Sequence, residues 1–396
     1  MMNNNNRKTN KKNRILPLIT TLLLMLLLAG CSGDNNTEKA GSALDEHLTG
    51  SMDLKYANQF HVNYYEDGLA IVEIEDGLKY LVTEGSDELP DWLPEEEIGE
   101  MTLICAPAKS VYLAASSAMD LFDASGALDS VKMTSTQASD WSIDEIRKLV
   151  EENTIQYIGK YRAPDYETLL EGGADLAIES TMIYHSPQVK EAIEELGIPV
   201  LVERSSYESD PLGRLEWIRL YGLLTGHIGE ADAFFEKAVE KMNSIDTSSI
   251  SESPSVAFFS VNSNGSVVVR KPGDYVTRMI ETAGGTYALD GITEEEENAL
   301  STMNMQMEAF YDKAVDADIL IYNSTIEGGL EKVSDLTVLS DQFKDFKAVK
   351  EGRVWCTEAS TFQKTTGAAD MTVELNKIFA GADSDEGMEY FHLLEQ

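Results

Sequence analysis

The hydrophobic and polar positions of the chain divide it into an apolar N-terminal segment, a hairpin and two long alternating series. Residues 15–28 are almost uniformly apolar. Residues 72–74 and 79–82 alternate apolar and polar side chains around Asp76-Gly77, which is typical of a β-hairpin. Beyond residue 101, short apolar runs alternate with segments of helix length.

The first alternating series extends from residue 102 to residue 202. Its apolar runs predict strands at 102–106, 131–133, 155–158, 176–178 and 200–202. The segments between them predict helices at 110–122, 143–151, 165–171 and 187–196. Such alternation favours a mostly parallel sheet covered by helices on both faces.

A long helix is expected between this series and the second one. Apolar residues recur at steps of three and four across 229–245, the spacing of an amphipathic helix, and polar residues followed by Pro254 end it. The second series then predicts strands at 256–259, 267–269, 319–322 and 354–356, and helices at 275–283 and 366–379. Asp274 is the expected N-cap of the first of these helices.

The predicted fold class is therefore α/β, with two lobes joined by one helix. The expected boundaries are an N-terminal lobe at 53–228, an inter-lobe helix at 229–246 and a C-terminal lobe at 254–396.

Composition excludes several classes of protein. The 396 residues carry 69 acidic and 31 basic side chains, a net charge of −38, which is too acidic for a general nucleic-acid binder. The three cysteines lack the spacing of a zinc ribbon or a redox pair. Cys105 and Cys356 each end a predicted strand, and we expect them to be buried free thiols.

The N-terminal segment has the features of a secretory signal. Five basic residues precede the apolar run, which is shorter than the roughly 20 residues of a membrane-spanning helix. The run ends in Leu28-Ala29-Gly30-Cys31, which resembles the bacterial lipobox. This resemblance implies removal of residues 1–30, acylation of Cys31 with palmitate-type chains, and a polar tether at 31–52. The mature protein is expected outside the cytoplasm, anchored to the cell membrane by its lipid.

Several strings of residues resemble one family in their order along the chain. Residues 157–170 read YIGKYRAPDYETLL, and ADLAI at 174–178 and ELGIPV at 195–200 follow them. Together they resemble the signature of the iron-siderophore and cobalamin class of ABC-transporter substrate-binding proteins. Further strings fall in the family's order at 219–226, 280–285, 317–321 and 348–355. The similarity covers residues 56–381.

The resemblance implies a monomeric receptor with two Rossmann-like lobes, a rigid inter-lobe helix and a ligand cleft between the lobes. Such a receptor is not an enzyme and has no resident cofactor; it delivers a metal chelate to an ABC permease dimer with its ATPase subunits. Since ligands of open α/β sheets bind beyond the carboxyl ends of the strands, residues after the predicted strands are expected to line the cleft.

The candidate ligand-binding residues are aromatic, basic or polar side chains at or after the predicted strands: Tyr112, Trp141, Lys160, Tyr161, Arg162, Tyr184, His185, Arg204, Tyr207, Arg270, Lys271, Thr325, Trp355 and Phe362, with Lys109 and Asn323 beside them. Basic residues are scarce in this chain, so their position there suggests an anionic ligand, with aromatic rings for stacking and cation–π contacts. A ferric catecholate is the narrowest expectation.

The resemblance also implies a contact with the permease. In this family one surface glutamate on each lobe docks into arginine pockets, a geometrically specific pairing. Glu167, eight residues before Asp175, matches the position in the first lobe. Glu308, ten residues before Asp318, is the best match in the second, with Glu281 or Glu331 as alternatives.

Other functions remain open at this stage. Capture of bare zinc or manganese needs about three converging histidine or carboxylate ligands, and only His185 of the five histidines follows a predicted strand. Haem remains an alternative, because Tyr184, His185 or a methionine could ligate its iron, and so does a cobamide. A secreted hydrolase is disfavoured by the lack of Gly-x-Ser-x-Gly, phosphate-binding glycine loop and His-Glu-x-x-His motifs.

Overall fold

The computed structural model describes residues 42–292 and 301–396. The predicted signal peptide, Cys31 and the first part of the predicted tether lie outside the described residues. Among the described helices, none has both the length and the apolar character needed to cross a membrane.

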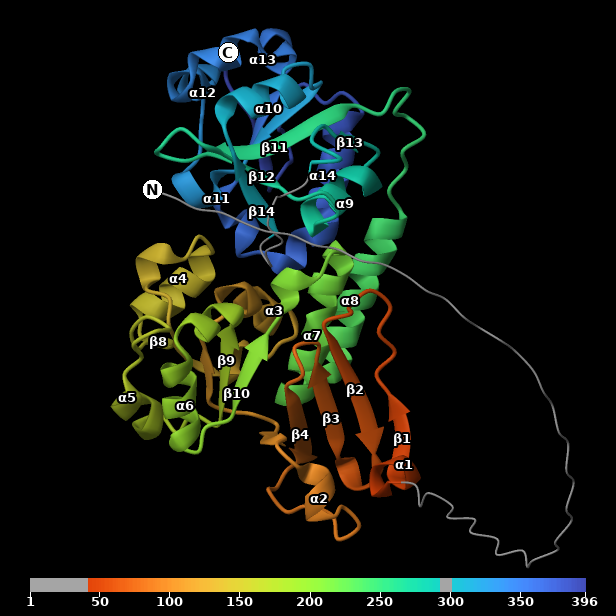
Figure 1. Cartoon of the computed structure of the whole chain (residues 1–396), viewed down its shortest axis with the longest axis vertical. Coiled ribbons are helices and arrows are strands. Elements are labelled where there is room, and N and C mark those ends of the chain that lie inside the picture. Colours follow the sequence, from red (N-terminus) through yellow and green to blue (C-terminus); the bar gives the residue numbers. More distant parts are fainter. Residues whose placement is uncertain (1–41, 293–300) are drawn as a thin grey trace, which may run out of the picture. The chain divides into compact units, whose positions relative to one another are not determined.

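The first sheet is mainly antiparallel and has the order β1-β2-β3-β4-β5. Its strands are β1 Leu48–Ser51, β2 Phe60–Tyr65, β3 Ala70–Ile74, β4 Lys79–Glu84 and β5 Thr102–Ala106, with the short helices α1 Ala43–His47 and α2 Glu95–Ile98 beside them. The predicted hairpin is confirmed: β3 and β4 pair antiparallel around Gly77, whose φ of 94° suits glycine. Figure 1 shows β2, β3 and β4 side by side.

Two expectations for this region were wrong. Residues 48–51, expected to belong to the tether, pair with β2 as strand β1. The strand at 102–106 was expected to join the later strands of its lobe, but it is β5 and pairs parallel with β4. The first lobe therefore contains two sheets where one was predicted.

The second sheet is entirely parallel, in the order β10-β9-β6-β7-β8. Its strands are β6 Val111–Leu113, β7 Val131–Thr134, β8 Gln156–Tyr157, β9 Leu176–Ser180 and β10 Val200–Glu203. The helices α3 Met119–Ala124, α4 Asp144–Glu151, α5 Tyr166–Glu171 and α6 Pro187–Glu195 alternate with them. The prediction of one helix over 110–122 was wrong: residues 111–113 form the fully buried central strand β6, and the α-helix begins only at Met119, after a 3-10 turn at Ser116–Ala118.

The third sheet forms the second lobe, in the order β14-β12-β11-β15-β16-β17, with β13 beside β11. Its strands are β11 Ser255–Val261, β12 Val267–Arg270, β13 Thr286–Tyr287, β14 Thr302–Met305, β15 Ile319–Tyr322, β16 Val354–Thr357 and β17 Phe391–Leu393. The helices are α9 Tyr275–Thr282, α10 Met307–Ala314, α11 Ser324–Glu327, α12 Val333–Leu339, α13 Lys347–Glu351 and α14 Ala368–Phe379. Asp274 caps α9 as predicted, accepting hydrogen bonds from the N–H groups of Val276 and Thr277.

The parallel parts of the second and third sheets begin in the same way. Asp175, just before β9, donates its N–H to the carbonyl of Ser110 and accepts the N–H of Ser110 on its carboxylate. Asp318, just before β15, makes the same two contacts with Ser255. The two lobes thus share one strand-pairing device, and the α/β fold class is confirmed.

The predicted inter-lobe helix is present and packs against the helix that precedes it. Helix α7 Pro211–Thr225 is buried on nearly all sides and is followed directly by α8 Ile228–Asn243, which corresponds to the predicted helix. Both pack against α14 of the second lobe. Gly222 permits the close approach of α7 and α8, because a Cβ there would lie 2.7 Å from that of Ala231.

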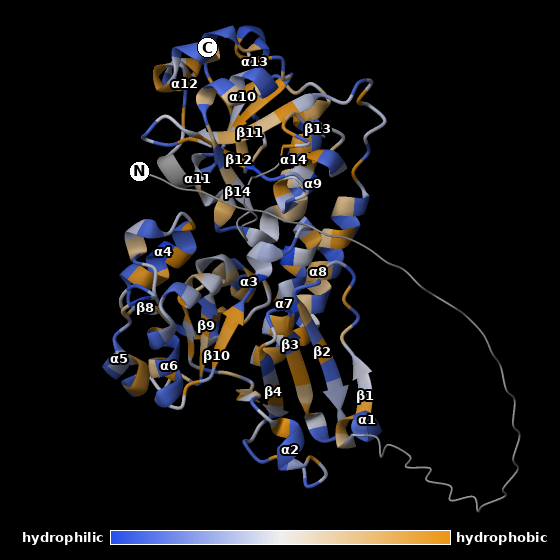
Figure 2. Ribbon diagram, in the orientation of Figure 1, coloured by the Kyte–Doolittle hydropathy of each residue, from blue (hydrophilic) through white to orange (hydrophobic). Residues whose placement is uncertain are grey.

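The hydrophobic core follows this division. One cluster of buried side chains joins the first two sheets with α7 and α8, and another fills the second lobe. Ala369 of α14 belongs to the first cluster although it lies in the second lobe. Figure 2 shows the apolar character of β3, β10 and β11.

Candidate functional site

A cavity lies at the carboxyl ends of all five strands of the parallel sheet; we call it the inter-lobe cavity. Its lining from the first lobe comes from the residues at or just after the ends of these strands: Ala114–Ser117, Ser135, Thr136, Lys160, Tyr161, Ser180–Met182, Glu203, Ser206 and Tyr207. Ser301 and Phe362 contribute from the second lobe. Its volume is about 480 Å³. This is the edge at which open α/β sheets bind their ligands.

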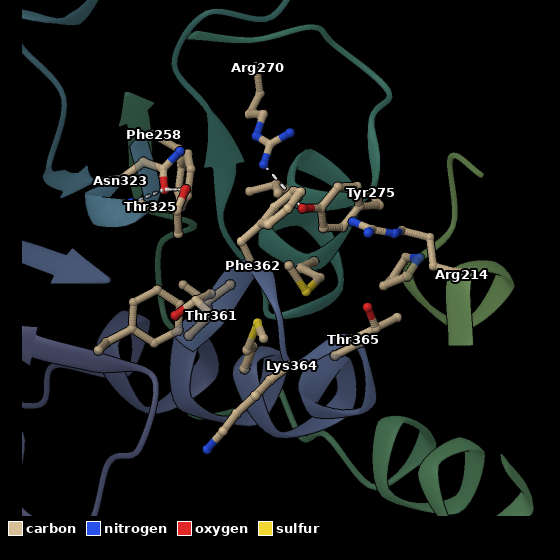
Figure 3. A pocket seen from close by; sticks show the side chains of 17 residues that line it. Arg214, Phe258, Arg270, Tyr275, Asn323, Thr325, Thr361, Phe362, Lys364 and Thr365 are labelled. Atoms are coloured by element: carbon tan, nitrogen blue, oxygen red, sulfur yellow. Dashed lines mark hydrogen bonds between the residues drawn. The ribbon is translucent and has the colours of Figure 1, made fainter. Parts of the chain in front are cut away.

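A second and much smaller cavity, of about 40 Å³, lies mainly in the second lobe; we call it the arginine cavity (Figure 3). Arg214 of α7, Arg270 of β12 and Tyr275 of α9 line it, together with Asn323 and Thr325 after β15. Phe362, 48% exposed, lines both cavities, so the two are neighbours.

The arginine cavity contains a closely packed cationic cluster. Arg270 donates to the hydroxyl groups of Tyr275 and Ser301, both at 3.1 Å, and its Nη1 lies 3.2 Å from a carboxylate oxygen of Asp274. The Arg214 guanidinium lies 4.0 Å from the centroid of the Tyr275 ring. Burial alone would raise the pKa of Tyr275, but Arg270 and Arg214 together outweigh it and lower that pKa.

Several predicted residues do line these cavities. The inter-lobe cavity includes Lys160, Tyr161 and Tyr207, the arginine cavity includes Arg270 and Thr325, and Phe362 belongs to both.

Three of the residues predicted to bind the ligand are core residues instead. Tyr112, Trp141 and Trp355 belong to the hydrophobic core, with at most 1% of their surface exposed. Tyr112 lies on the central strand β6 of the parallel sheet and Trp355 on β16, next to the edge strand β17. Trp141 donates its Nε1–H to the Thr136 carbonyl within the first lobe. Their size and burial assign them to packing.

Five other predicted residues also lie outside the lining of the two cavities: Arg162, Tyr184, His185, Arg204 and Lys271. Arg204 comes nearest, since its guanidinium lies 4.2 Å from the centroid of the Tyr207 ring while its Nε donates to Gln59. Tyr184 donates its hydroxyl to Asp76 of the β3–β4 hairpin. These two side chains therefore connect the first and second sheets.

Basic residues were expected to line the cleft after strands of both lobes. Most of the basic residues that line a cavity lie in the arginine cavity instead. In the inter-lobe cavity Lys160 is accompanied by the acidic Asp140 and Glu203. In the arginine cavity Arg214 and Arg270 meet at the Tyr275 ring, whereas Lys364 borders the cavity with its ammonium group paired to Glu389 (Figure 3). Arg214 and Tyr275 were missed because they lie on helices. The charged residues Arg214, Glu216 and Arg219 among the apolar residues of α7 were the available signal.

The second lobe contacts the first beside the inter-lobe cavity. The Gln363 side chain accepts the N–H of Ser142 at 2.7 Å and donates to the Asp140 carbonyl at 2.8 Å. The N–H of Thr366 donates to the carboxylate of Asp120, whose pKa is raised by burial despite this bond. These contacts hold the segment that includes Phe362 against the first lobe.

The predicted docking residues occupy matching places. Glu167 lies in the first turn of α5 and Glu308 in the first turn of α10, and both are exposed. Each helix precedes a strand that begins with the shared aspartate device, Asp175 or Asp318.

Neither Cys105 nor Cys356 lines the inter-lobe cavity or the arginine cavity. Cys356 is a buried free thiol as predicted, whereas Cys105 is free but exposed. Within the described ranges, no three histidine, cysteine or carboxylate side chains are grouped so as to hold a metal ion.

Comparison with known proteins gives matches over most of the chain. The model of the family described as periplasmic binding protein matches residues 111–361. An uncharacterized lipoprotein of Methanocaldococcus jannaschii is 24% identical over 322 residues, which cover 76% of this chain and 75% of that protein.

Solved structures show the same fold. The periplasmic heme-binding protein HutB of Vibrio cholerae has a TM-score of 0.55 and 15% identity, covering 68% of this chain and 98% of its own. An ABC-type Fe3+-hydroxamate transport system of Saccharomonospora viridis has a TM-score of 0.51 and 18% identity, covering 70% and 94%. The family match begins at β6, so the first, antiparallel sheet precedes it.

The buried carboxyl group of Glu179 should make the stability of the protein depend on pH. This residue of β9 is fully buried and neither carboxylate oxygen has a hydrogen-bond partner within the described structure. Burial raises its pKa to about 8 from 4.5. The folded protein therefore retains a proton that the unfolded chain releases, and this residue's contribution to stability falls as pH rises from about 4.5 to 8.

Replacing Glu179 with Gln should remove that loss, so Glu179→Gln should gain stability relative to wild type as pH rises from 4.5 to 8. Urea unfolding at several pH values measures the difference. Glu191→Gln, at an exposed position of α6, is the control and should follow wild type. Parallel curves for wild type and Glu179→Gln would contradict the assignment.

Proposed function

Because the chain belongs to the periplasmic binding protein family, we propose that it is the substrate-binding component of an ABC importer and captures an iron chelate between its lobes. The observation that carries this proposal is the inter-lobe cavity, where five strand ends of one lobe meet Phe362 of the other. Its volume of about 480 Å³ suits a chelate better than a bare ion, since pockets that bind small molecules have about 300–1,000 Å³.

The proposed ligand is an anionic chelate with aromatic groups, of ferric catecholate type. Tyr161, Tyr207 and Phe362 offer rings for stacking, and Lys160 offers a cation. The cations of the arginine cavity lie next to them, across Phe362. The Fe3+-hydroxamate transport protein with this fold supports an iron chelate as the class of ligand.

Haem is the second candidate. The phenol groups of Tyr161 and Tyr207 are oxygen donors of the kind that can hold haem iron, and the heme-binding HutB shares the fold. Tyr184 and His185, the ligands expected from the sequence, do not line the cavity. A cobamide is the third member of this set and is included in the test below.

The proposed location is the outer face of the cell membrane. The lipobox-like sequence ending at Cys31 supports lipid anchoring, and the curated relative described above is itself named a lipoprotein. The proposed partner is a permease dimer with its ATPase subunits, which Glu167 and Glu308 would contact from the two lobes.

Binding titrations test the ligand. Purified protein is titrated with a ferric catecholate, a ferric hydroxamate, hemin and cobalamin, and quenching of tryptophan fluorescence is followed. At least one iron chelate should bind, and Tyr161→Leu or Phe362→Leu should weaken it at least tenfold, or about 1.4 kcal/mol.

Tyr157→Leu is the matched control, because Tyr157 is an exposed tyrosine of the same segment that does not line the cavity. It should bind like wild type. Failure of every iron chelate to bind, or unchanged affinity in Tyr161→Leu and Phe362→Leu, would contradict the proposal.

Uptake measurements test the docking residues. Glu167→Ala combined with Glu308→Ala should abolish uptake of the ligand into cells while its affinity for the isolated protein stays unchanged. The double variant Glu171→Ala with Asp312→Ala changes the same charge on the same two helices and should transport normally. A loss of ligand affinity in the first double variant would overturn the docking assignment.

A further inference from the structure

The carboxylate of Glu203 is buried at one end of the inter-lobe cavity. Glu203 is the last residue of β10, lines the cavity and is only 2% exposed. One of its oxygens accepts the N–H of Ser205 at 2.8 Å, and the other accepts the hydroxyl of Ser117 at 3.3 Å. Because a carboxylate can accept about four hydrogen bonds, acceptor positions of Glu203 remain unused.

The charge of this carboxylate has no counter-charge among the described residues. Arg204, the next residue, directs its guanidinium to Asp76 and Gln59. Lys160 is the one basic residue in the described lining of the cavity, and it follows β8, at the opposite edge of the parallel sheet from β10 (Figure 1). Four strand spacings of about 4.8 Å place these two strands roughly 19 Å apart. Lys160 therefore does not neutralise Glu203.

Two neighbours on α7 show what Glu203 lacks. Glu216, which is also buried, accepts three backbone N–H groups and lies 3.4 Å from Arg219. The hydroxyl of Tyr221 is buried without a hydrogen-bond partner in the described structure, and burial, followed by the charge of Glu203, raises the pKa of Tyr221. Burying an anion is costly unless a counter-charge or enough donors accompany it. For Glu203 that group has to come from the cavity.

The lining near Glu203 defines which cation matches it. Ser116 and Ser206 line the cavity after β6 and β10 and offer hydroxyl oxygens. A protonated amine carries three N–H donors, which one carboxylate and two hydroxyl oxygens can accept. A bare metal ion is a poorer match, since no three metal-ligating side chains are grouped within the described ranges.

We propose that Glu203 binds a protonated amine of the captured ligand at the β10 end of the inter-lobe cavity. The cavity then recognises both signs of charge, with anionic groups of the ligand toward Lys160 at the β8 end. That the amine belongs to an iron chelate rests on the proposed function; recognition of the amine by Glu203 does not.

A small amine tests this recognition without iron. The protein is titrated with 3-phenylpropylamine, which is protonated at neutral pH, and with the uncharged 3-phenylpropanol, followed by ligand-observed NMR. The amine should bind at least tenfold more tightly than the alcohol. Glu203→Gln should remove this preference, because it keeps the shape of the side chain without its charge. Glu195→Gln, at an exposed position of α6 outside the cavity, should retain it.

Equal binding of amine and alcohol, absence of binding, or a preference that survives in a folded Glu203→Gln would overturn the proposal. If Glu203→Gln does not fold, Glu203→Asp serves in its place, since it withdraws the carboxylate by one methylene and should weaken the preference; an unchanged preference would overturn the proposal.

A pair of iron chelates separates this inference from the proposed function. Ferrioxamine B and its N-acetyl derivative hold Fe3+ through the same hydroxamate groups and differ only at a terminal amine, so the free amine should bind more tightly. Iron chelates that bind with no preference for a free amine would sink the amine site and spare the proposed function. Binding of 3-phenylpropylamine that depends on Glu203, with no iron chelate bound, would do the reverse.

Discussion

The carboxylate of Glu216 lies fully buried within α7, where it accepts hydrogen bonds from the backbone N–H groups of Lys55, Tyr56 and Ala57 at 2.8–3.1 Å. Glu208, just before the helix, does the same for the next two residues of that segment. Burial of a carboxylate is costly unless such donors accompany it, so these bonds fix the mainly antiparallel sheet to α7. Because α7 also packs against α9 and α14 of the second lobe, this one helix contacts both lobes.

The site depends on this helix as well. Arg214 extends from α7 into the arginine cavity, while the segment that includes Phe362 is held against the first lobe by Gln363 and its neighbours. One cavity is bordered by strand ends and aromatic rings, and the other concentrates buried cations in a protein of net charge −38. The buried arginines of this second cavity therefore stand out from the acidic composition of the chain, whereas the inter-lobe cavity combines Lys160 with Asp140 and Glu203.

The sequence predicted much of the fold and less of the site. Periodicity located β9, β10, β15 and β16, because buried parallel strands are continuous apolar runs between turns. It failed at 110–122, where a short central strand and a helix are separated only by residues 114–118, which contain neither glycine nor proline. Strand-end reasoning found Tyr161, Arg270 and Phe362, yet it also selected Trp355, since the hydrophobicity of a residue does not tell a cavity wall from a core. Arg214 and Tyr275 were missed because only tertiary packing brings α7 and α9 together.

The central claim is that a metal chelate binds between the lobes, at the strand ends of the parallel sheet. The most direct measurement is anomalous diffraction at the iron absorption edge from crystals grown with the ferric chelate that binds in solution. The account predicts one iron site in the inter-lobe cavity, bordered by Tyr161 and Phe362. An iron site elsewhere on the protein, with this cavity empty, would contradict it.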